Sequence, residues 1–118
     1  MKENIALEKS YIFALQIIQI YFYLTNEKKE YVLSKQLLKS GTSIGANLEE
    51  AAGAQSRADF VAKVHIALKE ARETDYWIRL IRDSKLLDDS RAEKLREDCI
   101  VIMKILTKTL ITCKTTKT

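Results

Sequence analysis

The sequence contains no proline, and its three glycines all fall within the single stretch Ser40–Gly53. Proline and glycine mark the turns between short strands, so their scarcity excludes a turn-rich sheet protein and favours long helices. Histidine occurs once and cysteine twice. Sites built from several such residues are therefore not expected.

Long apolar segments are also absent. The most apolar run, YIFALQIIQIYFYL, is 14 residues long and contains Gln16 and Gln19, so it is too short for a bilayer, which needs about 20 apolar residues. The first ten residues carry acidic side chains and no apolar core, unlike a signal peptide. Cys99 and Cys113 fall on one predicted helix, roughly 21 Å apart, beyond the roughly 7 Å limit for a disulfide. We therefore expect a cytoplasmic protein with reduced thiols and no membrane contact.

What the chain does contain is a regular apolar pattern. Its 118 residues are 47% apolar and 31% charged, as is typical of one globular domain. Apolar residues recur at intervals of three and four, which indicates amphipathic helices, and short connections imply antiparallel neighbours. We predict one all-α domain over residues 1–118, an antiparallel up-down-up-down four-helix bundle. The predicted helices span about residues 4–24, 29–52, 57–83 and 90–112, with a short basic tail at 113–118.

Two nearly identical segments mark helix starts, SRAD from Ser56 and SRAE from Ser90. A serine followed three residues later by an acid is typical of a helix start. We therefore predict that Ser56 and Ser90 cap the third and fourth helices. Gly53 follows the second helix at a position where a left-handed helix stop is common.

Gly41 and Gly45 lie inside the predicted second helix. A phosphate-binding loop requires the pattern G-x-x-x-x-G-K-[ST] after a strand; here the glycines are four apart and no lysine follows Gly45. Two interpretations remain, a loop near Ser40–Ser43 or a continuous helix with a face of small residues. An interior glycine costs roughly 1 kcal/mol relative to alanine, which is typical where another backbone comes close or the helix bends.

The segments SIGANLEEA (Ser43–Ala51) and IALKEARETDYWIRL (Ile66–Leu80) resemble the four-helix bundle family of 23S rRNA intervening-sequence proteins, and the resemblance extends over essentially the whole chain. Many members of that family read S-I-P-x-N where this chain has Gly45 and Asn47. The resemblance therefore implies a long second helix kinked near Gly45. Gly41, Gly45 and Asn47 are the candidates for this kink and for close packing.

The first predicted helix is apolar around most of its circumference. A bundle buries only one stripe of each helix, so the second apolar face predicts an oligomer interface. Its candidate residues are Tyr11, Ile18, Tyr21 and Phe22. The resembling family is associated with homopentamers, and the related accessory variability determinant of diversity-generating retroelements forms a pentameric barrel. The resemblance thus implies a homo-oligomer of five subunits.

The net charge is +4 at pH 7, and no acidic residue follows Asp98. Lysines near a helix C-terminus suit the helix dipole, and this plain interpretation stays open beside nucleic-acid contact. Five copies would carry about +20, and contacts to phosphate would depend strongly on salt but not on base sequence. The candidate nucleic-acid-binding residues are Arg72, Arg79, Arg82, Lys104, Lys108, Lys114 and Lys117.

No motif for catalysis or metal binding is present in the sequence. Four glutamates, Glu49, Glu50, Glu70 and Glu73, lie on the second and third predicted helices, but a di-iron bundle needs Glu-x-x-His on each of two helices. The single histidine, His65, follows Ala62 at that spacing, so we predict that these glutamates pair with Arg72, Arg79 or Lys69. Cys99 and Cys113 follow the core stripe of their helix, and Trp77 is predicted to anchor the core or an interface.

We therefore predict no catalytic residue, no metal, no cofactor and no small-molecule substrate. Two functions stay open. The first is a non-enzymatic, homo-oligomeric bundle that associates with RNA, DNA or a nucleic-acid enzyme through basic surfaces. The alternative is a protein-interaction scaffold with no nucleic-acid binding.

Overall fold

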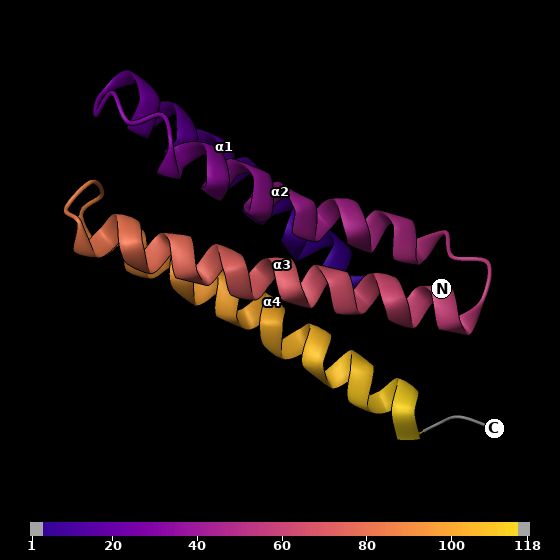
Figure 1. Ribbon diagram of the computed structural model, residues 1–118. Helices are drawn as coiled ribbons and strands as arrows, with labels where there is room; N and C mark the ends of the chain where they lie inside the picture. Colours follow the sequence, from indigo (N-terminus) through magenta and orange to yellow (C-terminus); the bar gives the residue numbers. More distant parts are fainter. Residues whose placement is uncertain (1–3, 116–118) are drawn as a thin grey trace.

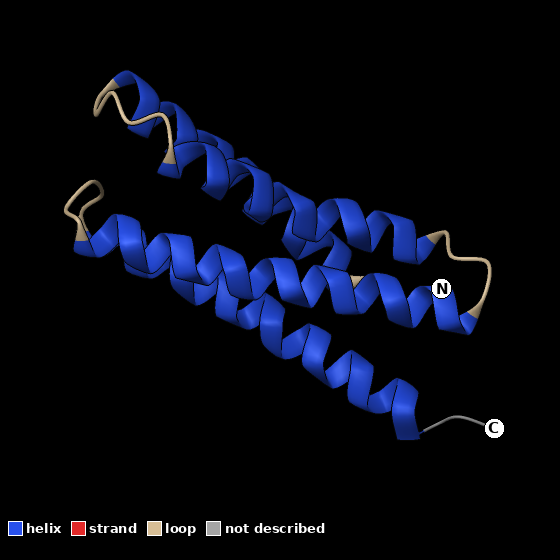
Figure 2. Ribbon diagram, viewed as in Figure 1, coloured by secondary structure: helices blue, strands red, loops and turns tan. Residues whose placement is uncertain are grey.

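The computed structural model describes residues 4–115, and these form four α-helices (Figures 1 and 2). They are α1 (Ile5–Asn26), α2 (Leu33–Ala52), α3 (Arg57–Asp83) and α4 (Asp89–Thr115). The described residues contain no strand. The predicted all-α class is thereby confirmed, and the helix boundaries differ from the predicted ones by about one turn at most.

Each helix packs against the next one along the chain, and α4 packs more sparsely against α1 (Figure 1). The four helices therefore form a square with up-down-up-down order, in which the α1–α2 side is opposite the α3–α4 side. One end of the square, the terminal end, holds the start of α1 and the end of α4. The other, the hairpin end, holds the connections 27–32 and 84–88.

One buried stripe from each helix forms the core, as the apolar periodicity predicts. The stripe includes four buried hydroxyl side chains, and two of them meet where Thr74 Oγ1 donates a hydrogen bond to Ser40 Oγ at 3.0 Å. Large and fully buried side chains are Phe13, Ile17, Leu24, Leu37, Ile44, Val64, Ile78, Ile81, Ile102 and Leu106. This core extends over the full length of the bundle and fixes the outward faces of all four helices.

The glycine-rich stretch is helical throughout, so the alternative of a loop near Ser40–Ser43 is wrong. A Cβ on Gly41 would lie 2.7 Å from Cγ1 of Ile17, and one on Gly45 would lie 3.3 Å from Oγ of Ser10. The glycines thus allow α1 and α2 to approach closely, as the small-residue face predicts. Asn47 bonds within its own helix, because its Nδ2 donates to the Ser43 carbonyl at 2.8 Å. The bend expected at Gly45 stays a prediction.

The two predicted serine caps have different outcomes. Ser56 caps α3 as predicted, because its side chain accepts a hydrogen bond from the Asp59 N–H at 3.0 Å. Ser90 does not cap α4, and that prediction is wrong. Asp88 takes the role instead, since its Oδ2 accepts from the Arg91 N–H at 2.9 Å. An aspartate is at least as good a cap as serine, so α4 begins one residue before Ser90.

The second helix starts later than predicted, at Leu33 rather than near Lys29. Lys29 has a left-handed backbone with φ 56°, which interrupts a helix. The Glu30 carboxylate then accepts hydrogen bonds from the N–H groups of three residues that follow, Val32, Leu33 and Ser34. Gly53, with φ −100°, is not a left-handed stop, so that prediction is wrong as well.

Candidate functional site

Two candidate nucleic-acid-binding residues, Arg79 and Arg82, are held by carboxylates toward the hairpin end of α3. Arg79 Nε lies 3.1 Å from Oδ2 of Asp75, and Arg82 Nε lies 2.8 Å from Oδ1 of Asp83. Arg82 also donates to Glu93 of α4. Hydrogen bonds to Asp83 and then to Glu93 raise the pKa of Arg82 above its ordinary value. The charges of both arginines are thus matched within the chain.

The other described candidates line a groove between α3 and α4 that extends from the middle of these helices to the terminal end. Arg72 of α3 and three lysines of α4, Lys104, Lys108 and Lys114, line it together with His65. Its inner part measures about 340 Å³ and its outer part about 390 Å³. We call this surface the basic groove. Lys117, the last candidate, lies outside the described residues.

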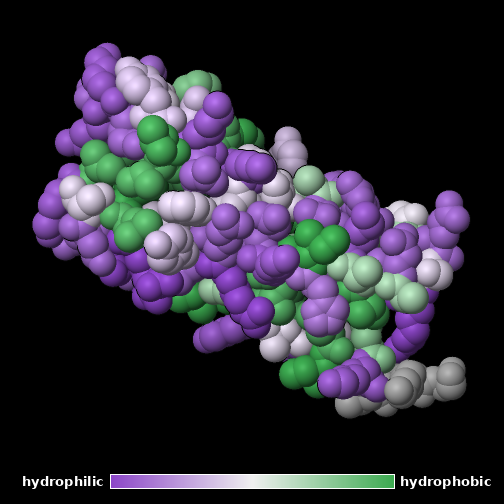
Figure 3. All heavy atoms as spheres, in the orientation of Figure 1, coloured by the Kyte–Doolittle hydropathy of each residue, from purple (hydrophilic) through white to green (hydrophobic). Residues whose placement is uncertain are grey.

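The basic groove combines a cationic rim with an apolar floor. Its floor includes Leu68, Met103 and Leu110, and none of the described residues that line it is acidic. Figure 1 shows the C-terminal half of α4 directed away from α3. In the same region, hydrophobic spheres are visible between hydrophilic ones in Figure 3. A groove of this kind suits a partner with both negative charge and apolar surface.

The cationic side chains of the basic groove are not neutralised by neighbours. Within residues 4–115, no carboxylate lies within ion-pair distance of Arg72, Lys104, Lys108 or Lys114. Lys104 and Lys108 are exposed and, being four residues apart, share one outward face of α4. They border only the outer part of the groove. We call these two lysines the α4 ridge.

The four candidates for an oligomer interface all lie on α1, with different exposure. Tyr11 is 65% exposed and Phe22 is 55% exposed, whereas Ile18 and Tyr21 are half-buried. Leu15 is exposed too, and the sequence-based list omits it. The helical spacing would have identified Leu15, because residues 11, 15, 18 and 22 follow one helical stripe. This stripe is directed away from the core.

The described residues offer little for catalysis. Cys99 is fully buried, its Sγ donates to the Ala71 carbonyl at 3.3 Å, and burial raises the pKa of its thiol to about 12. Cys113 was predicted to be in the core but is only half-buried and lines the basic groove. His65 is exposed. Among residues 4–115, no three His, Cys, Asp or Glu side chains are grouped to hold a metal ion.

The glutamates of α2 and α3 do not all have the predicted partners. Glu50 pairs with Lys63 at 2.8 Å, which is not one of the three predicted partners. Burial, followed by repulsion from Glu73, raises the pKa of the Glu70 carboxyl. Trp77 packs against the core at its edge, as predicted.

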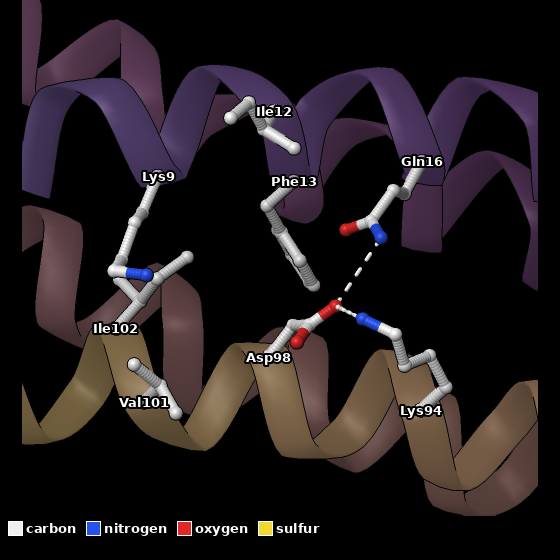
Figure 4. Close-up of a pocket in the computed structure, with 8 residues that line it drawn as sticks. All are labelled: Lys9, Ile12, Phe13, Gln16, Lys94, Asp98, Val101 and Ile102. Carbon is white, nitrogen blue, oxygen red and sulfur yellow. Dashed lines mark hydrogen bonds and ion pairs between the residues drawn. The ribbon is translucent and has the colours of Figure 1, made fainter.

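A small cleft of about 210 Å³ lies between α1 and α4 (Figure 4). Asp98 accepts hydrogen bonds there from Nε2 of Gln16 at 3.2 Å and from Nζ of Lys94 at 2.7 Å. These polar groups are thus paired with one another. The volume is also below the roughly 300–1,000 Å³ of typical ligand sites, so the cleft is not a convincing small-molecule site.

None of the helices in residues 4–115 has an apolar stretch long enough to cross a bilayer. The family model described as "23S rRNA-intervening sequence protein" matches residues 2–108. The chain is also similar to a crystal structure from Bacteroides thetaiotaomicron VPI-5482, described as a protein with unknown function from the S23 ribosomal protein family. The two are 48% identical with a TM-score of 0.88, over 89% of this chain and 97% of the other. No curated protein sequence matches the chain.

Proposed function

The chain belongs to the 23S rRNA-intervening sequence protein family, and we propose that it is a non-enzymatic, homo-oligomeric accessory protein that associates with nucleic acid. The contact surface in this proposal is the α4 ridge, Lys104 and Lys108, supported by Lys114. The absence of a carboxylate partner for these lysines among the described residues is the observation that carries the proposal.

Unpaired lysines on an outward helix face suit phosphate. They attract a polyanion from a distance and release its counterions on contact. Each copy contributes one α4 ridge, so an oligomer multiplies the contact. Five copies, the number that the family resemblance implies, would present five ridges on one particle. The buried Cys99 thiol fits a cytoplasmic setting, where thiols stay reduced.

The exposed stripe of α1 supports the oligomer. Tyr11, Leu15 and Phe22 place three large apolar side chains on the surface of one helix. A monomer rarely leaves such a surface in contact with water. The proposed assembly covers it with another copy of the chain.

The proposal is tested by the salt dependence of binding to labelled single- and double-stranded RNA and DNA. The variant Lys104→Glu/Lys108→Glu removes two phosphate contacts, so its log–log salt slope should be smaller by roughly 2 and its affinity lower by at least about tenfold. The matched control is Lys28→Glu/Lys29→Glu, which makes the same charge change on exposed residues at the hairpin end.

If the control weakens binding as much as the ridge variant does, the contact is unspecific and the α4 ridge is not the site. No binding by the wild-type protein near physiological salt would favour the alternative, a protein-interaction scaffold without nucleic-acid affinity.

A further inference from the structure

A second hollow lies on the opposite side of the bundle from the basic groove, between α1 and α2. Its two adjoining parts, of about 220 and 390 Å³, share Tyr11 and Glu49. Gly45 and Ala46 leave space in it because their side chains are absent or small, and Glu8 also lines it. None of the described residues that line it is basic. We call this surface the acidic hollow.

The acidic hollow and the basic groove are complementary in charge. The hollow has two exposed carboxylates, Glu8 and Glu49, and the groove has Arg72 and Lys114 on its inner part. Opposite potentials on two surfaces favour their association and fix its register. The complement of each surface is therefore present on another copy of the same chain.

Each surface also combines a hollow or groove with a large exposed apolar side chain. Tyr11 protrudes beside the acidic hollow with 65% of its surface exposed, and Ile111 protrudes beside the basic groove with 58% exposed. An apolar helix stripe that lies in a groove between two helices is a common mode of recognition. The Tyr11 stripe of α1 fits this mode, and the small residues of the acidic hollow leave room for Ile111.

The positions of the two surfaces allow a head-to-tail assembly. The acidic hollow uses the start of α1 and the end of α2, and the basic groove uses the start of α3 and the end of α4. Because neighbouring helices are antiparallel, all four segments lie at the terminal end, on opposite sides of the square. A contact between different surfaces at one level repeats by rotation and forms a ring when the rotation closes.

We infer that the basic groove of one copy receives the Tyr11 face of α1 from the next copy, while Ile111 enters the acidic hollow of that copy. The inference rests on the oligomer of the proposed function and names its contact surfaces. It leaves the α4 ridge at the outer edge of the groove for nucleic acid. The apolar floor favours this occupant over nucleic acid for the inner groove, because phosphate offers no apolar match.

Two single variants and their mixture test the inference by native mass spectrometry. Tyr11→Glu damages the α1 face and leaves the groove intact; Ile111→Glu does the reverse. Each variant alone should lose the assembled species and be a monomer of 13.6 kDa. The equimolar mixture should form a one-to-one dimer, since it retains one intact contact. Tyr31→Glu, an equally exposed tyrosine at the hairpin end, is the matched control and should assemble normally.

Other results would overturn the inference in distinguishable ways. If both variants assemble like the wild type, the oligomer stands but its contact lies elsewhere. If only Tyr11→Glu is monomeric and the mixture forms no dimer, α1 pairs with α1 of its neighbour. A monomeric wild-type protein would remove both the oligomer and the inference. An Ile111→Glu variant that keeps its mass but loses RNA binding would assign the inner groove to nucleic acid.

A cross-link provides a second readout that does not depend on disrupting the contact. Cys113 lines the basic groove, so Tyr11→Cys should form a disulfide with the Cys113 of a neighbouring copy under a mild oxidant. A ladder of linked chains is expected on a non-reducing gel, and Cys113→Ser should abolish it. If an assembled Tyr11→Cys protein gives no linked chains, Tyr11 does not contact a neighbour's groove.

Discussion

The two ends of the α3–α4 pair have similar numbers of basic side chains but differ in ion pairing. At the hairpin end, Asp75 bridges the helices, with Oδ2 3.1 Å from Nε of Arg79 and Oδ1 2.9 Å from Nε of Arg96. Toward the terminal end, Lys108 and Lys114 have no carboxylate within ion-pair distance among the described residues, and the same holds for Arg72 and Lys104 near the middle of their helices. The ion pairs at the hairpin end thus join α3 to α4, whereas the unpaired cations remain available to a partner.

The comparison shows that pairing, rather than the number of charges, identifies an interaction surface. Arg79 and Arg82 count toward the basic character of α3 as much as Arg72 does. Their carboxylates neutralise them inside the chain, so they add to stability and little to the external field. The unpaired group around the basic groove keeps its charge available to a partner.

Removal of Asp75 should abolish the ion pairs at the hairpin end, and we expect it to have the largest effect on stability. Its side chain is only 13% exposed, and Asp75→Ala leaves two arginines without their shared carboxylate. We expect a loss of about 2 kcal/mol in the free energy of unfolding, measured by urea denaturation. Arg72→Ala in the basic groove is the comparison and should change the free energy of unfolding by less than about 0.5 kcal/mol. Equal losses from both variants would contradict the difference between the ends.

Acid should loosen the hairpin end before the terminal end. The hydrogen bond from Arg82 lowers the pKa of Asp83, and that from the Arg91 N–H lowers the pKa of Asp88. A carboxyl with a lowered folded pKa stabilises the fold while ionised, above its ordinary value of 3.8, and this contribution is lost as pH falls through the lowered value. Amide exchange near residues 79–93 should therefore accelerate first below about pH 4; simultaneous loosening of residues 100–112 would argue against this.

The smallest expected effect is a difference in chemical reactivity between the two thiols, Cys99 and Cys113, in the folded protein. Burial raises the pKa of Cys99 to about 12, so iodoacetamide near pH 8 should spare it. Cys113 is half-buried in the basic groove. In the monomeric Ile111→Glu variant it should react at least about tenfold faster than Cys99 does. Peptide mass spectrometry separates the two sites, and faster labelling of Cys99 would mean that the core around it opens.

The fold was predictable because each helix records its own buried stripe. Phe13, Ile17 and Leu24 lie at the spacing that burial requires, and Ser56 lies at the start of α3 where its cap is needed. Such signals depend only on residues close together in the chain, so they can be recognised from the sequence alone. Asp88 shows the limit even here, since it lies two residues before Ser90 and the sequence pattern does not say which of the two side chains caps the helix.

The candidate site was less predictable because it depends on the register between helices. Arg96 and Asp75 are 21 positions apart, and no spacing rule along one helix brings them together. The same holds for Arg82 and Glu93. The sequence thus named Arg72, Lys104, Lys108 and Lys114 in one list with two arginines that the fold neutralises.

Hydrogen exchange of the wild-type protein with and without a short single-stranded RNA tests the central claim most directly. RNA should slow exchange in the C-terminal half of α4, around Lys104 and Lys108, and should leave residues 75–98 unchanged. Protection centred on the ion-paired hairpin end, or none in any segment while RNA is bound, would contradict it.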